Sequence, residues 1–222
     1  ESVFDTTENK YIRLFIYKYF NVKAVVSLPQ ITFAPYTNTK TSILFAQKKT
    51  QEEIKQWNNV WEKYSKEYSS LKTRVENLVD VYKGLKNKEK LPSIKDLSKA
   101  EERKILERLL KNYIEEKDSD LSNEELIKKY VDELIELCKF DKDTKDEFGF
   151  VNTWWVFGEV AKELDYNIFM AETDFIGYKR TIRGEKITQN ELYRTDEKSK
   201  IIVDDGVQNT IVDYMRNNIE WE

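Results

Sequence analysis

Two aromatic residues and a lysine lie close together in a proline-containing stretch near the start of the chain: Phe33, Tyr36 and Lys40. Pro29 and Pro35 fix the backbone of this stretch and each lacks an N–H donor, so we expect a stiff loop and not a strand. Aromatic faces beside a cation form a candidate binding site, because binding residues concentrate on loops held by a rigid scaffold. Two interpretations stay open: a binding loop, or aromatic side chains that cap the hydrophobic edge of a sheet.

The segments on either side of this loop are predicted to be strands. Apolar runs bounded by turn residues cover residues 24–28 and 41–46, which is typical of short strands buried on both faces of a sheet. Ahead of them, an apolar stripe predicts a helix over residues 7–20 that packs on the sheet. A helix that leads into a strand is typical of a layered α/β domain.

The sequence offers few other groups for catalysis or metal binding. It contains no histidine, which excludes histidine acid–base chemistry and the commonest metal ligand. The acidic run at residues 141–147 lacks the spacing of an EF-hand, so we predict a solvated loop and no metal site. The single cysteine, Cys138, lies on a helical face and is expected in the core. It excludes an intrachain disulfide and fits a reducing compartment.

The charge of the chain is unevenly distributed. The net charge is −4, yet residues 1–49 carry seven Lys or Arg against three acidic residues. A second basic group consists of Lys179, Arg180, Arg183, Lys186 and Arg194. This is not the uniformly basic surface of a free-standing nucleic-acid binder. It is compatible with local phosphate contacts made by two segments, if these segments fold together.

A long helix is predicted from Gln51 to about Lys86. Thr50 and Glu53 form a capping box, and apolar residues then recur at spacings of three and four. The recurring positions are Ile54, Trp57, Trp61, Tyr64, Tyr68, Leu71, Val75, Leu78, Tyr82 and Leu85. Large aromatic residues fit poorly in the seam of a parallel dimer, so we expect an antiparallel partner within the chain or on a companion subunit. The candidate docking residues are Trp57, Trp61, Tyr64 and Tyr68.

The rest of the chain is predicted to be helical and then mixed. Capping boxes at Ser98 and Ser122 begin further helices, the second followed by an apolar face that extends to Cys138. Residues 152–164 suit a helix, residues 167–171 and 176–181 suit strands that rejoin the first sheet, and residues 207–217 suit a closing helix. No run approaches the roughly 18 apolar residues of a membrane span, so no membrane is expected as a partner.

These patterns predict a mixed α/β protein that is mainly helical. We divide the chain into residues 1–49 with the opening strands, residues 50–147 as a helical insertion or arm, and residues 148–222 as a helix and strands that return to the sheet.

The stretch L-P-Q-I-T-F-A-P-Y-T-N-T-K-T-S-I-L-F-A-Q-K-K, preceded by a helix that carries Arg13, resembles a segment of a known family. The segment lies near the end of the catalytic domain of N6-adenine DNA methyltransferases, and the likeness is closest to the modification subunit of type I restriction systems. A weaker likeness covers residues 175–193. The resemblance implies that the strands are the tail of a Rossmann-like methyltransferase sheet of two to four strands, with the long helix and its bundle inserted.

The resemblance also implies a function. Such enzymes use S-adenosylmethionine and flip the target adenine out of the duplex, so Phe33 and Tyr36 would face the base. Lys40, Thr41, Lys179, Arg180 and Arg183 would contact the DNA. The glycine-rich cofactor turn and the Asn-Pro-Pro motif are not found here, so we expect a C-terminal portion without catalytic residues, and no cofactor bound to it.

Further expectations follow from the same family. The expected partners are double-stranded DNA, a specificity subunit or fused recognition domain, and a restriction subunit, in a prokaryotic cytoplasm. The alternative is a non-enzymatic module in which the long helix docks other proteins and the strands are scaffold.

Overall fold

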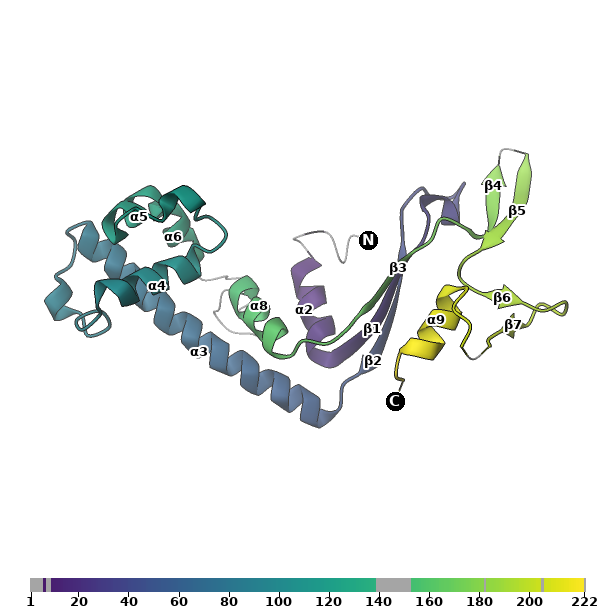
Figure 1. The fold of residues 1–222 in the computed structure, drawn as a ribbon, viewed down its shortest axis with the longest axis horizontal. Coiled ribbons are helices and arrows are strands. Elements are labelled where there is room, and N and C mark those ends of the chain that lie inside the picture. The colour runs from purple at the N-terminus through teal and green to yellow at the C-terminus, as the bar shows by residue number, and fades with distance from the viewer. Residues whose placement is uncertain (1–5, 7–8, 139–152, 182, 205, 222) are drawn as a thin grey trace. The chain divides into compact units, whose positions relative to one another are not determined.

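The fold is mixed α/β with more helix than strand, as predicted. The computed structural model describes residues 6, 9–138, 153–181, 183–204 and 206–221. The chain divides into two compact units, which we call the sheet unit, Glu1–Lys55 with Asp165–Glu222, and the helical unit, Gln56–Leu164. Figure 1 labels the elements of both.

A three-stranded sheet forms the centre of the sheet unit. Helix α2 (Lys10–Tyr19) leads directly into β1 (Phe20–Ser27), the middle strand. Strand β2 (Ser42–Lys48) pairs antiparallel with one edge of β1, and β3 (Phe169–Glu172) pairs parallel with the other. The predicted helix and both predicted opening strands are therefore present, and the strand predicted at residues 167–171 does join this sheet.

The two opening strands are not buried on both faces, so that part of the prediction is wrong. Alternate residues of β1 are fully buried, and β2 contains no fully buried residue. The reason is that β2 lies at the edge of a small sheet, and successive side chains of a strand point to opposite faces. The buried face packs against helix α9 (Ile211–Asn218), and its core consists of Ala24, Val26, Leu28, Ile176 and Met215.

The remaining strands form hairpins apart from the central sheet. Strand β4 (Ile176–Thr181) has the predicted bounds but the predicted pairing is wrong: it pairs antiparallel with β5 (Gly184–Asn190). Gly177 has a φ of +92° where the register shifts, as a glycine at a β-bulge allows. Strands β6 (Arg194–Thr195) and β7 (Ile201–Ile202) form a second short hairpin.

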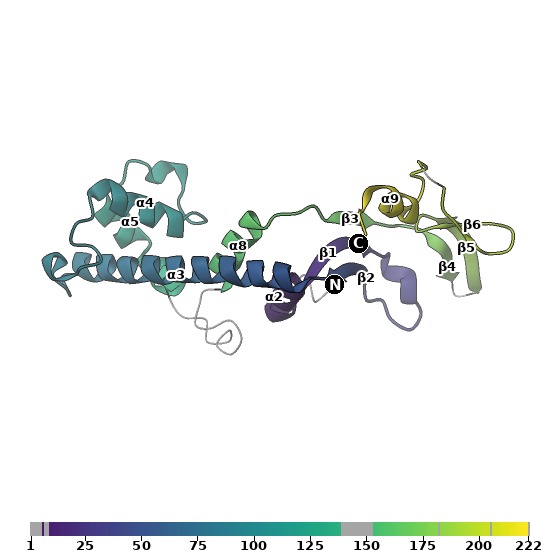
Figure 2. The same ribbon diagram turned by 90° about the horizontal axis from the view of Figure 1, so that it is seen from below.

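Helix α3 (Gln51–Tyr82) begins in the sheet unit and continues into the helical unit. It starts where predicted, because the Thr50 hydroxyl accepts from the Glu53 N–H at 3.2 Å and the Glu53 carboxylate accepts from the Thr50 N–H at 2.7 Å. It ends at Tyr82 and not near Lys86, which leaves the last predicted apolar position, Leu85, 70% exposed. Figure 2 shows this helix side-on.

The helical unit packs the second half of α3 against α4 (Lys99–Leu109), α5 (Asn123–Lys129) and α6 (Val131–Cys138). Partners within the chain, one of the two predicted alternatives, therefore cover the second half of α3. The predicted capping boxes of α4 and α5 are confirmed. The apolar face after Ser122 belongs to two helices and not one, because the helix breaks at Tyr130. Cys138 is buried, as predicted.

Helix α8 (Thr153–Glu163) completes the described part of the helical unit. The loop predicted at residues 141–147 lies outside the described residues. The closing helix α9 begins at Ile211, later than predicted, because the Thr210 hydroxyl accepts from the Asp213 N–H at 3.4 Å and so caps the helix there.

Candidate nucleic-acid interface

The loop between β1 and β2 is closed by backbone hydrogen bonds. The Leu28 N–H donates to the Thr41 carbonyl at 2.9 Å, so the ends of the loop lie side by side. After Pro29, a short 3₁₀ helix, η2 (Gln30–Phe33), turns the chain, and the Thr32 hydroxyl donates to the Pro29 carbonyl at 2.5 Å. The predicted non-strand loop is therefore confirmed.

The two aromatic residues of the loop are exposed to different degrees. Tyr36 is 85% exposed and Phe33 is 47% exposed. A side chain that capped the hydrophobic edge of the sheet would lose most of its accessible surface to its neighbours. The capping interpretation is therefore wrong for Tyr36, whose ring is open to solvent.

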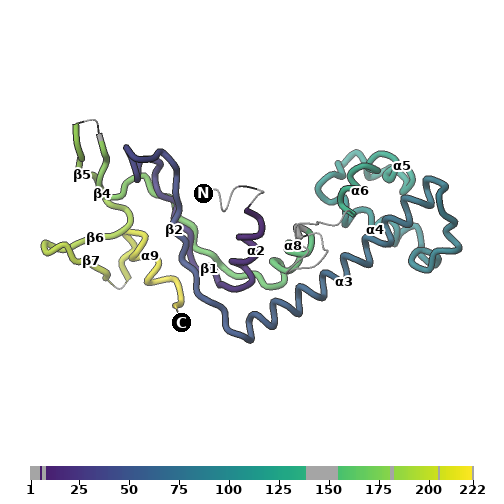
Figure 3. The backbone as a smooth tube through the Cα atoms, turned by 180° about the vertical axis from the view of Figure 1, so that it is seen from behind, coloured from purple at the N-terminus to yellow at the C-terminus, as the bar shows by residue number. Residues whose placement is uncertain are grey.

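The basic hairpin β4–β5 lies beside this loop, so the two predicted binding segments do fold together. The Tyr178 hydroxyl donates to the Thr32 carbonyl at 2.8 Å. The guanidinium carbon of Arg180 lies 5.9 Å from the centroid of the Tyr36 ring, within the range of a cation–π interaction. Figures 1 and 3 show the hairpin next to the segment that follows β1.

The hairpin presents several cations to solvent. Lys179 lies directly opposite Lys186 across the two strands, and Arg183 is exposed in the turn between them. Arg180 lies opposite Glu185, and their charged atoms are 3.9 Å apart. The sequence prediction included these cations but missed β5, which decides which residues face each other. Gly184, which begins β5 directly after the turn between two β-prone runs, was the available signal.

The other predicted loop contacts point elsewhere. The Lys40 ammonium forms an ion pair with Glu172 of β3 at 2.6 Å, and this lysine lowers the pKa of the Glu172 carboxyl. The Thr41 hydroxyl is buried and has no hydrogen-bond partner among the described residues. The Lys40 ammonium is therefore engaged by a carboxylate, and the Thr41 hydroxyl is not exposed.

Arg194, which the sequence grouped with the basic residues, is held by acidic side chains. Its guanidinium forms two hydrogen bonds to Asp213, at 3.1 and 3.0 Å, and a third to Asp204 at 3.0 Å. The Asp213 carboxylate is fully buried, and Arg194 and the Thr210 hydroxyl lower its pKa, although burial alone would raise it. Arg194 therefore stabilises α9 against β6 and does not belong to the exposed basic surface.

The four docking candidates of α3 contact other side chains of their own unit. Trp57 and Trp61 are buried and stack at 4.9 Å between ring centroids. The rings of Tyr64 and Tyr68 both lie against the ring of Trp155 in α8, with centroid distances of 6.5 and 5.4 Å. Tyr68 also donates to the Leu137 carbonyl. Tyr64 and Tyr68 thus serve the internal packing of the helical unit, whereas Trp57 and Trp61 stack on each other along α3.

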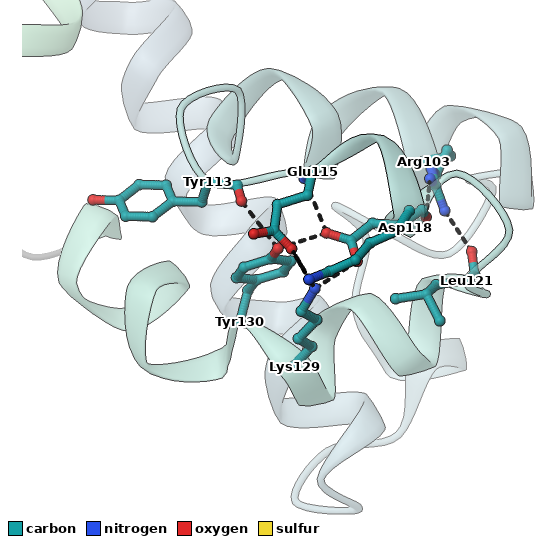
Figure 4. Close-up of polar contacts among 8 residues, drawn as sticks. Arg103, Tyr113, Glu115, Asp118, Leu121, Lys129 and Tyr130 are labelled. Carbon is teal, nitrogen blue, oxygen red and sulfur yellow. Dashed lines mark hydrogen bonds and ion pairs between the residues drawn. The ribbon is translucent and has the colours of Figure 1, made fainter.

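A buried polar network in the helical unit is also structural. Figure 4 shows Asp118, which accepts from Lys129 at 2.5 Å, from the Tyr130 hydroxyl at 2.6 Å and from the Glu115 N–H at 3.0 Å. These three donors lower the pKa of the Asp118 carboxyl. All of its partners belong to the loop before α5 and to the end of that helix, so this carboxylate fixes the break between α5 and α6.

The described residues contain hollows of ligand size but no cluster of metal-ligating side chains. Among them, no group of three or more His, Cys, Asp or Glu side chains is suited to hold a metal ion. One hollow of about 300 Å³ lies between α2 and the sheet, and another of about 580 Å³ is lined by residues of β3 and α9. Both volumes fall within the range of ligand pockets. Within the described ranges, no helix is long and apolar enough to cross a membrane.

No protein-family model matches the chain, and a comparison with curated proteins likewise finds no match. The family resemblance therefore stays a prediction from the sequence, and the site is argued from its geometry.

Proposed function

We propose that this chain is the C-terminal portion of an N6-adenine DNA methyltransferase of a restriction-modification system. In this proposal the loop at residues 28–41 and the β4–β5 hairpin contact DNA around the target adenine. The parent enzyme takes its methyl group from S-adenosylmethionine, which binds outside this chain. A specificity subunit or a fused recognition domain selects the DNA sequence.

The exposed ring of Tyr36 beside Arg180 carries this proposal. An adenine inside a duplex cannot reach an active site, so such an enzyme extrudes the base and stacks it against aromatic side chains. Tyr36 leaves a ring face open, and the Arg180 guanidinium supplies positive charge next to it. Phe33, which is half exposed on the same loop, adds a second aromatic surface. The likeness of residues 28–49 to modification subunits supports the choice of reaction.

Binding to two duplexes tests the proposed function. The chain is titrated against labelled duplexes that differ only in whether one adenine is paired or mispaired. Because a mispaired base costs less to extrude, we expect tighter binding to the mispaired duplex. Tyr36→Ala should remove this preference, and Tyr36→Phe, which keeps the ring, should retain it. Absence of binding to either duplex, or an unchanged preference in Tyr36→Ala, would contradict the proposed function.

A further inference from the structure

The β4–β5 hairpin has two faces with different neighbours. Tyr178 and Arg180 face the loop, since one donates to the Thr32 carbonyl and the other lies over the Tyr36 ring. Successive side chains of a strand point to opposite faces, so Lys179 lies on the face turned away from the loop. Lys186 of β5 is its direct partner in the register and shares that face.

These two lysines carry charge that the described residues do not neutralise. Lys179 and Lys186 are exposed, and neither forms an ion pair with any described residue. This contrasts with Lys40 and Arg194 of the same unit, which are held by carboxylates. Like charges directly opposite each other destabilise a hairpin. An anion placed between the two ammonium groups would relieve that repulsion.

We infer that Lys179 and Lys186 form a phosphate-binding pair that holds the backbone of the DNA whose extruded base reaches Tyr36. This inference rests on the proposed function and adds a second contact surface to it. A two-stranded β-ribbon is narrow enough to enter the major groove, and lysine ammonium groups bind phosphate as point charges. The pair positions the duplex without reading its sequence, since phosphate contacts carry no sequence information directly.

The salt dependence of DNA binding tests this pair. Affinity for duplex DNA falls with salt, with a logarithmic slope of about 0.9 per phosphate contact. The double variant Lys179→Gln/Lys186→Gln should therefore reduce the slope of the full chain by about two. The matched control is Lys198→Gln/Lys200→Gln, which removes the same charge from exposed lysines of the β6–β7 hairpin in the same unit. The control should leave the slope unchanged, and Lys179→Arg/Lys186→Arg should retain it.

The outcomes separate this inference from the proposed function. A slope reduced by about two in the double variant alone, with paired and mispaired duplexes weakened equally, supports the phosphate-binding pair. If the wild-type chain binds and prefers the mispaired duplex but the double variant keeps its slope, the pair is refuted while the proposed function stands. A wild-type chain that binds no DNA refutes both.

Two controls accompany the double variant. Its melting temperature should not fall, because the substitution removes a repulsion on an exposed hairpin. The single variants should each reduce the slope by about one.

Discussion

The guanidinium carbon of Arg180 lies 5.9 Å from the centroid of the Tyr36 ring. This contact connects strand β4, late in the chain, with the loop between β1 and β2, near its start. The two side chains come from elements that were predicted separately as an aromatic loop and a basic segment. Their contact joins the loop and the hairpin into one surface, which carries an exposed aromatic ring and a positive charge beside it.

The Tyr36–Arg180 pair predicts coupled effects on DNA binding. Stacking of a base on an aromatic residue contributes about 1–3 kcal/mol, so Tyr36→Ala should weaken DNA binding by roughly tenfold. Arg180→Ala should also weaken it, and the double variant should lose less than the sum, because the residues are in contact. The measurement is a double-mutant cycle by fluorescence anisotropy. Fully additive losses would show that the two side chains bind DNA independently.

Trp61 is predicted to stabilise the fold and not to bind a partner. It is 8% exposed and stacks on Trp57, so Trp61→Ala should lower the free energy of unfolding by about 3–5 kcal/mol. Urea denaturation measures this change. Leu85→Ala is the control, because Leu85 continues the same sequence pattern but is exposed, and it should have little effect. Unchanged unfolding of Trp61→Ala would instead assign this face of α3 to a partner subunit.

The Asp118 network predicts sensitivity to acid. The pKa of this carboxyl is lower in the folded chain than in the unfolded chain, chiefly because of Lys129, so the folded state binds fewer protons near the unfolded pKa of about 3.9. Its stabilising effect is therefore present above the unfolded pKa and is lost as the pH falls below that value toward the lower folded pKa. Asp118→Asn should have a lower melting temperature than the wild type at neutral pH, and its melting temperature should change less with pH in the acid range. Asp120→Asn, an exposed neighbour, should behave like the wild type; if both variants behave alike, the network is not stabilising.

Removing the charge of Arg194 should affect the melting temperature, whereas removing the charge of Arg183 should affect the salt dependence of DNA binding. Arg194→Gln leaves the buried Asp213 carboxylate without its two-pronged partner, so the melting temperature should fall, while the salt dependence of DNA binding stays the same. Arg183→Gln removes an exposed charge in the β4–β5 turn and should leave melting unchanged but reduce the salt dependence. Calorimetry and anisotropy titrations measure the two properties. A reversal of this pattern would return Arg194 to the DNA-binding surface.

Cys138 should report the unfolding of the helical unit. Burial raises the pKa of its thiol to about 12, and the thiolate is the reactive form. At about pH 8 a thiol-specific reagent should therefore react very slowly with the native chain and rapidly in denaturant. Because this is the single cysteine, no other thiol contributes to the signal. Immediate complete labelling of the native chain would show that α6 opens readily.

The sequence alone determined where α3, α4 and α5 begin and which face of α3 is apolar. Thr50, Ser98 and Ser122 cap helices through hydrogen bonds to residues three positions away, so the whole signal lies within one turn. The spacing of apolar residues in α3 is likewise a local property, and it also indicated that a partner must cover them. The end of α3 was misjudged, because Leu85 continues the pattern although the helix has stopped.

Only the tertiary structure decided what the strands and charges contact. Residues 176–181 have the composition of a strand, but strand composition does not specify the partner strand. In the folded chain they pair with residues 184–190 and not with the central sheet. Arg180 and Arg194 are chemically the same in the sequence, yet one lies on the exposed Tyr36 and the other on the buried Asp213. Whether a cation is free to bind DNA depends on which carboxylates the fold brings near it, and that is a property of distances in space.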